Sequence, residues 1–171
     1  RGMRNLREEI NELLGQKNRG APRLSQEEFY GKMRNSNFCL APYGDGLWSP
    51  RLTEALTMGC IPVIFPFCQD FSNCPELDST LPYFDLLDYE TFAVILPANK
   101  IPRMKQVLEA IPEWRRVEMR KNGQRAQPFF LHKVDGEYTQ GTSTLDMFMF
   151  ELWMRKTGRL GTFGRRSVIM G

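Results

Sequence analysis

The sequence is poor in metal-binding side chains and in excess charge. Its 171 residues include one histidine, His132, and four cysteines, none of them in a C-x-x-C arrangement. This scarcity excludes the usual zinc motifs, which need closely spaced cysteines and histidines. The 23 Lys and Arg residues exceed the 20 Asp and Glu residues by only three, which excludes a strongly basic nucleic-acid binder. No apolar run approaches the roughly 20 residues that cross a bilayer.

What is present is the composition of a globular domain, with 42% hydrophobic and 25% charged residues. This length and composition suffice for one buried core. The chain opens at Arg1, without a methionine, inside a pattern that predicts a helix. We therefore expect a piece of a larger protein, whose first strand precedes Arg1.

The four cysteines fall into two pairs with different surroundings. Cys39 and Cys60 each lie beside an apolar run and are predicted to be buried small hydrophobic residues. Cys68 and Cys74 flank a proline-rich loop. They form a disulfide if the compartment is oxidising and remain thiols if it is not, and spacing alone does not decide between the two.

Short apolar runs alternate with helical patterns along most of the chain. Continuous apolar runs predict strands buried on both faces at 38–41, 60–65 and 92–96. Helical spacing predicts helices at 3–14, 25–34, 50–58, 104–111 and 144–157, with 114–125 continuing the fourth. This alternation predicts an α/β fold, in which a single Rossmann-like parallel sheet is flanked by helices.

Several residues mark where these elements begin and end. Ser25 and Glu28 form a capping box, and Gly59 ends the helix that Ser49 and Pro50 begin. Pro62 is compatible with its strand only near the beginning or at an edge of the sheet.

The C-terminal region carries the most regular amphipathic pattern. It predicts a helix that starts at Thr144 and stops at Gly158, and whose apolar stripe belongs to the core. The stripe consists of Leu145, Phe148, Met149, Leu152 and Trp153. We place the domain at 1–156 and expect the Gly/Arg-rich tail at 157–171 to be disordered.

The segment 42–54 is the best candidate for a ligand site, because ligands of such sheets bind where strands lead into helix N-termini. Gly44 and Gly46 allow close approach of the backbone to a ligand. The amides from Ser49 onward favour an anion such as a diphosphate. Arg51 adds a positive charge, and Glu54, one turn later, can accept hydrogen bonds from sugar hydroxyls.

Each of these residues also has a structural interpretation. Arg51 and Glu54, three apart on a helix, are often only a solvated pair on the surface. Asp45 is a candidate catalytic carboxylate, but aspartate between two glycines is usually a turn residue. Trp48 either stacks on a ring of the ligand or packs against the sheet.

The same segment resembles the exostosin glycosyltransferases. The resemblance consists of F-C-L-x-P-x-G from Phe38, S-x-R-x-x-E-A-L from Ser49 and G-C-I-P-V-I from Gly59, in this order. A second block agrees, with L-P-Y-F from Leu81 and L-D-Y from Leu87. The resemblance covers roughly Arg1 to Trp153, the C-terminal half of the family's catalytic region.

The resemblance implies the C-terminal, donor-binding half of a GT-B enzyme, which transfers a sugar from a UDP-sugar with inversion and without an essential metal. In related members the Arg and Glu of S-x-R-x-x-E contact the nucleotide, and these positions match Arg51 and Glu54. The acceptor is a glycan or glycoprotein, bound by an N-terminal domain that is missing here. We therefore expect no transfer by this chain alone.

Family members also imply a location and partners. Most are Golgi proteins with one N-terminal membrane helix and a luminal enzyme, and an oxidising lumen suits a Cys68–Cys74 bridge. A hetero-oligomer with another family member is a further expectation.

Two alternative functions are open. One is a non-catalytic family member that serves as the partner subunit of a glycosyltransferase. The other is a dehydrogenase, suggested by Gly44 and Gly46. The dehydrogenase fingerprint is incomplete, because Ser49 stands at the place of the third glycine and no acidic residue ends the next strand.

Overall fold

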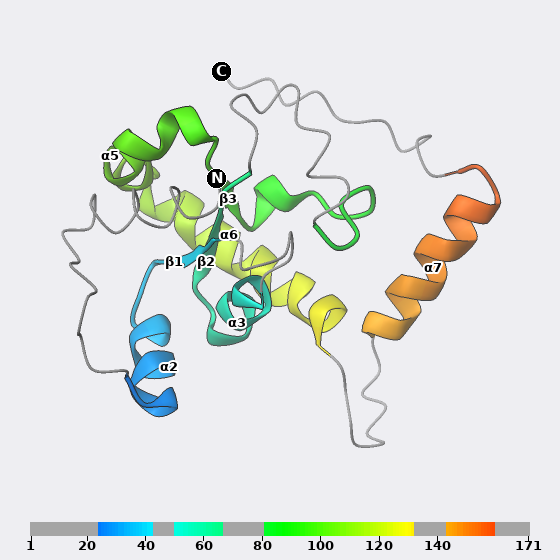
Figure 1. Cartoon of the computed structure of the whole chain (residues 1–171), viewed down its shortest axis with the longest axis horizontal. Helices are drawn as coiled ribbons and strands as arrows, with labels where there is room; N and C mark the ends of the chain where they lie inside the picture. The colour runs from blue at the N-terminus through cyan, green and yellow to red at the C-terminus, as the bar shows by residue number, and fades with distance from the viewer. Residues whose placement is uncertain (1–23, 43–49, 67–80, 132–142, 160–171) are drawn as a thin grey trace, which may run out of the picture.

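The computed structural model describes residues 24–42, 50–66, 81–131 and 143–159 of the chain (Figure 1). Within these ranges it is an α/β structure, with a parallel sheet of three strands and helices packed around it. The strands are β1 (Phe38–Ala41), β2 (Ile61–Ile64) and β3 (Val94–Ile95). The helices are α2 (Gln26–Arg34), α3 (Arg51–Met58), α5 (Met104–Glu109), α6 (Glu113–Ala126) and α7 (Thr144–Lys156), with 3-10 turns η2 (Tyr89–Thr91), η3 (Ala98–Arg103) and η4 (Gln127–Phe130). None of these described helices is long and apolar enough to cross a membrane.

The strands lie in the order β1-β2-β3, with Phe38 opposite Ile61 and Val63 opposite Val94. The predicted strands at 38–41 and 60–65 are confirmed to within a residue at each end. The third is shorter than predicted, because Phe92 and Ala93 follow the tight turn η2 and pair with no strand.

Pro62 lies in the central strand and is compatible with pairing there for a local reason. In a parallel ladder, successive residues of a strand bond alternately to the two neighbours. Ile61 donates its N–H to Asn37 on the β1 side, and the Ile64 carbonyl accepts from Leu96 on the β3 side. Pro62 therefore faces the β3 side, where the pairing begins only at Val63. Its missing N–H costs the sheet no bond.

Helices cover both faces of this sheet. One core cluster joins Leu52 and Leu56 of α3 to Ile64, Phe92 and Ala126. A second cluster, on the other face, joins Val63 and Phe65 to Leu96, Ile101 and Met104. Neighbouring residues of a strand point to opposite faces. Ile64 therefore packs in the first cluster and Val63 in the second.

The predicted helix ends are confirmed where short-range chemistry sets them. Ser25 caps α2: its hydroxyl oxygen accepts from the Glu28 N–H at 3.2 Å, and its own N–H donates to the Glu28 carboxylate at 2.8 Å. Hydrogen bonds from Ser25, first from its backbone, lower the pKa of the Glu28 carboxyl. Gly59 ends α3 with φ of 77°, a conformation that favours glycine.

A disulfide joins Cys39 of β1 to Cys60, the residue before β2. The two residues are buried, as predicted, but their interpretation as simple hydrophobic residues was wrong. The bridge forms because the register that sets Phe38 opposite Ile61 brings the two α-carbons to 5.8 Å, within the range that a disulfide spans. Cys68 and Cys74 lie outside the described residues.

Helix α7 is present as predicted, but its buried face is not the predicted one. Met147 and Met154 face the protein, whereas every member of the predicted stripe is between 45% and 65% exposed. The inward face is anchored by Tyr83, which donates its hydroxyl to the Thr144 carbonyl at 3.0 Å. The predicted helix at 3–14 and most of the tail at 157–171 lie outside the described residues.

Candidate functional site

The carboxyl ends of the three strands define the edge of the sheet where ligands of such folds bind. Helix α3 begins near this edge, because β1 ends at Ala41 and the chain then leads through an undescribed segment to Arg51. It ends at Gly59, next to the start of β2, at the opposite edge. The first turn of α3 therefore belongs to the ligand edge.

Arg51 and Glu54 are joined directly in this first turn. The Arg51 Nη1 atom donates to the Glu54 Oε2 atom at 2.5 Å. Their side chains are 44% and 26% exposed, respectively, so the pair is accessible from solvent without being fully hydrated. Such partly exposed pairs contribute little to folding, roughly 0–1 kcal/mol.

Phe29 of α2 is the third member of the cluster. The guanidinium carbon of Arg51 lies 4.9 Å from the centre of the Phe29 ring, within the range of a cation–π contact. The ring and the carboxylate together restrict the long Arg51 side chain. Sequence spacing does not predict this contact, because it depends on how α2 packs against α3.

The backbone at the start of α3 adds hydrogen-bonding capacity. The Pro50 carbonyl accepts the first bond of the helix, from the Glu54 N–H at 3.0 Å. No side chain of the described residues caps this helix start. The arrangement thus combines amide groups, the positive end of the helix dipole and a guanidinium, which together suit an anion.

The other predicted site residues cannot be placed. Gly44, Asp45, Gly46 and Ser49 lie outside the described residues, as does Trp48. The structure therefore brings together Arg51 and Glu54, and the rest of the predicted site stays a prediction.

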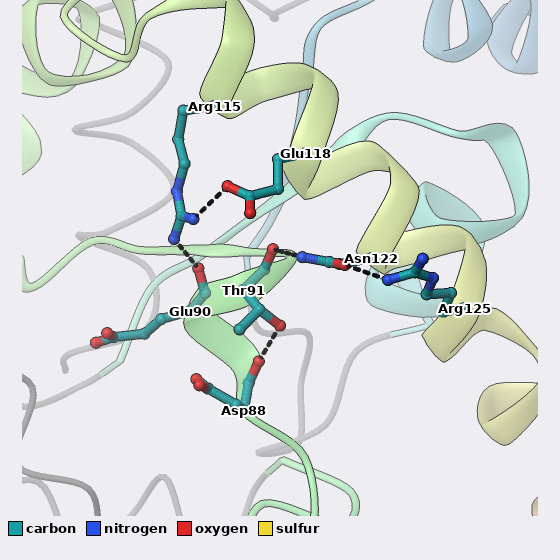
Figure 2. A network of polar contacts seen from close by, with 7 residues as sticks. All are labelled: Asp88, Glu90, Thr91, Arg115, Glu118, Asn122 and Arg125. Carbon is teal, nitrogen blue, oxygen red and sulfur yellow. Dashed lines mark hydrogen bonds and ion pairs between the residues drawn. The ribbon is translucent and has the colours of Figure 1, made fainter.

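A second polar cluster lies at the opposite edge, between η2 and α6 (Figure 2). Arg115 donates to the Glu90 carbonyl oxygen at 3.3 Å, and Asn122 donates to the Thr91 carbonyl oxygen at 3.2 Å. The Thr91 hydroxyl in turn donates to the Asp88 carbonyl oxygen at 2.6 Å. The bonds from Arg115 and Asn122 tie η2 to α6, and the bond from Thr91 closes the η2 turn itself, so the cluster has a structural role.

One carboxylate of this cluster has a shifted pKa. Burial raises the pKa of Glu90, and the nearby Asp88 raises it further, while Arg115 opposes them. A shifted carboxylate is a common sign of a catalytic site. Here it lies where the strands begin, away from the ligand edge, so we assign it to the structural cluster.

The crevice described at this edge is too small for a nucleotide. The crevice between α3 and α6 has a volume of about 10 Å³, enough for about one water molecule. Its lining includes Leu56, Cys60, Phe92 and Gly123. In the part of the chain that the structure describes, no three His, Cys, Asp or Glu side chains are grouped to hold a metal ion.

Comparison with known proteins identifies the family. Residues 3–111 match the exostosin GT47 domain. The probable glucuronosyltransferase GUT1 of Oryza sativa subsp. japonica is 35% identical over 102 residues, which are 60% of this chain and 22% of that protein. The probable beta-1,4-xylosyltransferase IRX10 of Arabidopsis thaliana is 35% identical over 100 residues, 58% of this chain and 21% of that protein.

The chain spans only about a fifth of the length of these two relatives. Their names describe sugar transfer, and a further relative, a probable glycosyltransferase of Arabidopsis thaliana, is 28% identical over 72% of this chain. The family match itself covers more than half of the chain and includes strands β1 and β2 and all of α3. The chain therefore belongs to the exostosin GT47 family of glycosyltransferases.

Proposed function

We propose that this chain is the donor-binding, Rossmann-like C-terminal half of a GT-B glycosyltransferase, and that it holds a UDP-sugar at the start of α3. The observation that carries the proposal is the Arg51–Glu54 pair in the first turn of a helix that follows the half-buried parallel strand β1. Family membership supports the same reaction class.

In this proposal each group has a separate task. A guanidinium has five N–H donors, so Arg51 can hold Glu54 and a diphosphate oxygen at the same time. Glu54 accepts hydrogen bonds from the ribose hydroxyls, and the amides of the helix start, with Gly44, Gly46 and Ser49 before them, receive the phosphates. Phe29 keeps the guanidinium in place.

The transfer step needs an acceptor hydroxyl that loses a proton as it attacks the sugar. In an inverting reaction, that hydroxyl attacks the anomeric carbon from the face opposite UDP, and the bond to UDP breaks. We propose Asp45 as a candidate base for this proton. The acceptor is a glycan or glycoprotein held by an N-terminal domain of a longer polypeptide, or by another family member in a hetero-oligomer. The names of the relatives make UDP-glucuronate and UDP-xylose the first donors to test.

We further propose that the protein works in an oxidising compartment such as the Golgi lumen. The buried Cys39–Cys60 disulfide supports this location, because structural disulfides are rare in reducing compartments.

Calorimetry with UDP tests the site. We expect Arg51→Ala and Glu54→Ala each to weaken UDP binding at least about 10-fold, since each removes a charge-assisted hydrogen bond. Addition of EDTA should leave the affinity unchanged if no metal is essential.

The pair Arg115–Glu118 on α6 is the matched control. It has the same spacing and a 2.7 Å ion pair, but it lies at the opposite edge of the sheet. Arg115→Ala and Glu118→Ala should bind UDP as the unchanged chain does. Equal affinity in all four variants would contradict the proposed site. Sugar transfer by the full-length parent then separates an enzyme from a non-catalytic partner subunit.

A further inference from the structure

Helix α7 presents two different faces. Its inward face carries Met147 and Met154, which are buried, and Thr144, whose hydroxyl donates to the Leu131 carbonyl at 2.8 Å. These contacts, together with the hydrogen bond from the Tyr83 hydroxyl to the Thr144 carbonyl, determine which face of α7 points toward the protein. The outward face is therefore a settled surface of the molecule, and Figure 1 shows α7 (orange) at its margin, with no described element beyond it.

The outward face carries a contiguous apolar stripe, with the exposed Asp146 near its start and the exposed Arg155 and Lys156 at its end. We define the outward stripe as the five residues that recur at spacings of three and four along α7. They are Leu145, Phe148, Met149, Leu152 and Trp153. With the neighbouring Phe150, which stacks on Trp153 at 5.9 Å, all six side chains are at least 45% exposed. Contiguous exposed apolar surface of this kind marks an interaction site.

We propose that the outward stripe pairs with the same stripe of a second copy of this chain, in an antiparallel arrangement about a two-fold axis near Met149. A two-fold interface uses the same patch on both subunits. In the antiparallel arrangement, Leu145 of one copy lies opposite Trp153 of the other. This inference does not depend on the proposed donor site.

Charge at the two ends of the stripe favours this arrangement. Asp146 lies in the first turn of α7, and Lys156 lies in the last turn. Arg159 follows the helix, with its guanidinium 5.1 Å from the Trp153 ring. Antiparallel pairing brings the acidic end of each helix to the basic end of its partner and opposes the two helix dipoles. An anionic membrane offers no such match for Asp146.

The area is also sufficient. Half-exposed side chains of this size present on the order of 100 Å² each, so a symmetric pair buries roughly 1,000–1,200 Å² in total, at the lower end of specific interfaces. We therefore expect a dimer that dissociates on dilution.

Sedimentation equilibrium of the whole chain over a range of concentrations tests the proposal. We expect a reversible monomer–dimer equilibrium, weakened on the order of 100-fold by Met149→Glu, because two carboxylates then meet at the axis. The matched control is Trp114→Glu, which adds the same charge at an apolar side chain of α6 that is 69% exposed. It should dimerise as the unchanged chain does.

A second measurement locates the contact. In Met149→Cys, a short thiol-reactive crosslinker should join two copies far above the level of the unchanged chain, and in Trp114→Cys it should not. Circular dichroism of each variant shows that α7 is still folded, and UDP binding of Met149→Glu should be unchanged.

Several outcomes would overturn the proposal. A monomer at every concentration would do so, as would a dimer that survives Met149→Glu or is lost equally in Trp114→Glu. Binding of the monomer to anionic phospholipid vesicles, abolished by Met149→Glu, would assign the stripe to a membrane surface instead.

Discussion

At the scale of single residues, the two sets of polar side chains around the sheet differ in what they bond to. Arg51 and Glu54 bond to each other at the ligand edge. Arg115 and Asn122 bond to main-chain oxygens of η2 at the opposite edge. Arg115 also pairs with the Glu118 side chain at 2.7 Å, so its main-chain bond is what distinguishes it. Side chains that bond to the backbone hold the fold in place, and in the proposed function the Arg51–Glu54 pair would exchange partners with an anion.

Glu90 gives a prediction at this scale. Its pKa is raised in the folded protein, so between the unfolded and folded pKa values the folded state binds more protons, and stability falls as the pH rises through that window. We expect Glu90→Gln to raise the thermal midpoint at pH 7, because the neutral amide removes the cost of burying a carboxylate beside Asp88. The difference in thermal midpoint between the variant and the unchanged chain should vanish at about pH 3, which lies below both the folded and the unfolded pKa of Glu90.

Thermal unfolding of both proteins at the two pH values measures this effect. Glu109→Gln is the control, since it removes a charge from α5 at a side chain that is 67% exposed. A Glu90→Gln variant that is less stable than the unchanged chain at pH 7 would show that the carboxylate stabilises the fold.

At the scale of elements, α3 connects the two edges of the sheet in only eight residues. Its first residue belongs to the candidate site, and its last is followed by Gly59 and the disulfide. Helix α6 crosses nearby, where a Cβ atom at Gly123 would meet Leu56 of α3 at 3.4 Å, an ordinary contact. The two glycines therefore have different roles, because the backbone conformation requires glycine at 59 and the packing does not require it at 123.

These roles predict opposite effects of the same substitution. Gly59→Ala should lower the free energy of unfolding by about 1 kcal/mol, because φ of 77° disfavours a side chain. Gly123→Ala should raise it by about 0.5–1 kcal/mol, because alanine is the better helix former and its methyl group meets Leu56 at 3.4 Å, an ordinary contact. Urea unfolding measures both. Destabilisation by Gly123→Ala would show that α3 and α6 cannot accommodate the methyl group.

At the scale of the whole molecule, the parallel sheet followed from the alternation of apolar runs and helical patterns, and the predictable details were those set by neighbours in the sequence. The capping box of Ser25 and Glu28, the end of α3 at Gly59 and the proximity of Arg51 to Glu54 all involve residues within one helical turn. Such contacts follow from spacing alone.

The parts that could not be predicted depend on how distant segments pack. The Cys39–Cys60 bridge requires the register between β1 and β2, and the Phe29–Arg51 contact requires the packing of α2 on α3. For α7, periodicity correctly predicted a helix with an apolar stripe. It cannot show whether that stripe faces the chain's own core or another molecule.

The disulfide gives a prediction at the scale of the whole molecule. It closes a loop of 21 residues, and loops of this length contribute about 3 kcal/mol in the chain-entropy account. We expect Cys39→Ala combined with Cys60→Ala to lower the free energy of unfolding by this amount, measured in urea without reductant.

Reductant provides the internal control. It should destabilise the unchanged chain by about the same amount and leave the double variant nearly unaffected. An unchanged chain that unfolds at the same urea concentration with and without reductant would contradict a stabilising role for the bridge.

The position of this bridge also has a practical consequence for making the protein. Bacterial cytosol keeps thiols reduced. In a chain synthesised there, Cys39 and Cys60 would remain unlinked thiols while the sheet forms. Secretion through the periplasm, or production in yeast or insect cells, should give the larger yield of folded material.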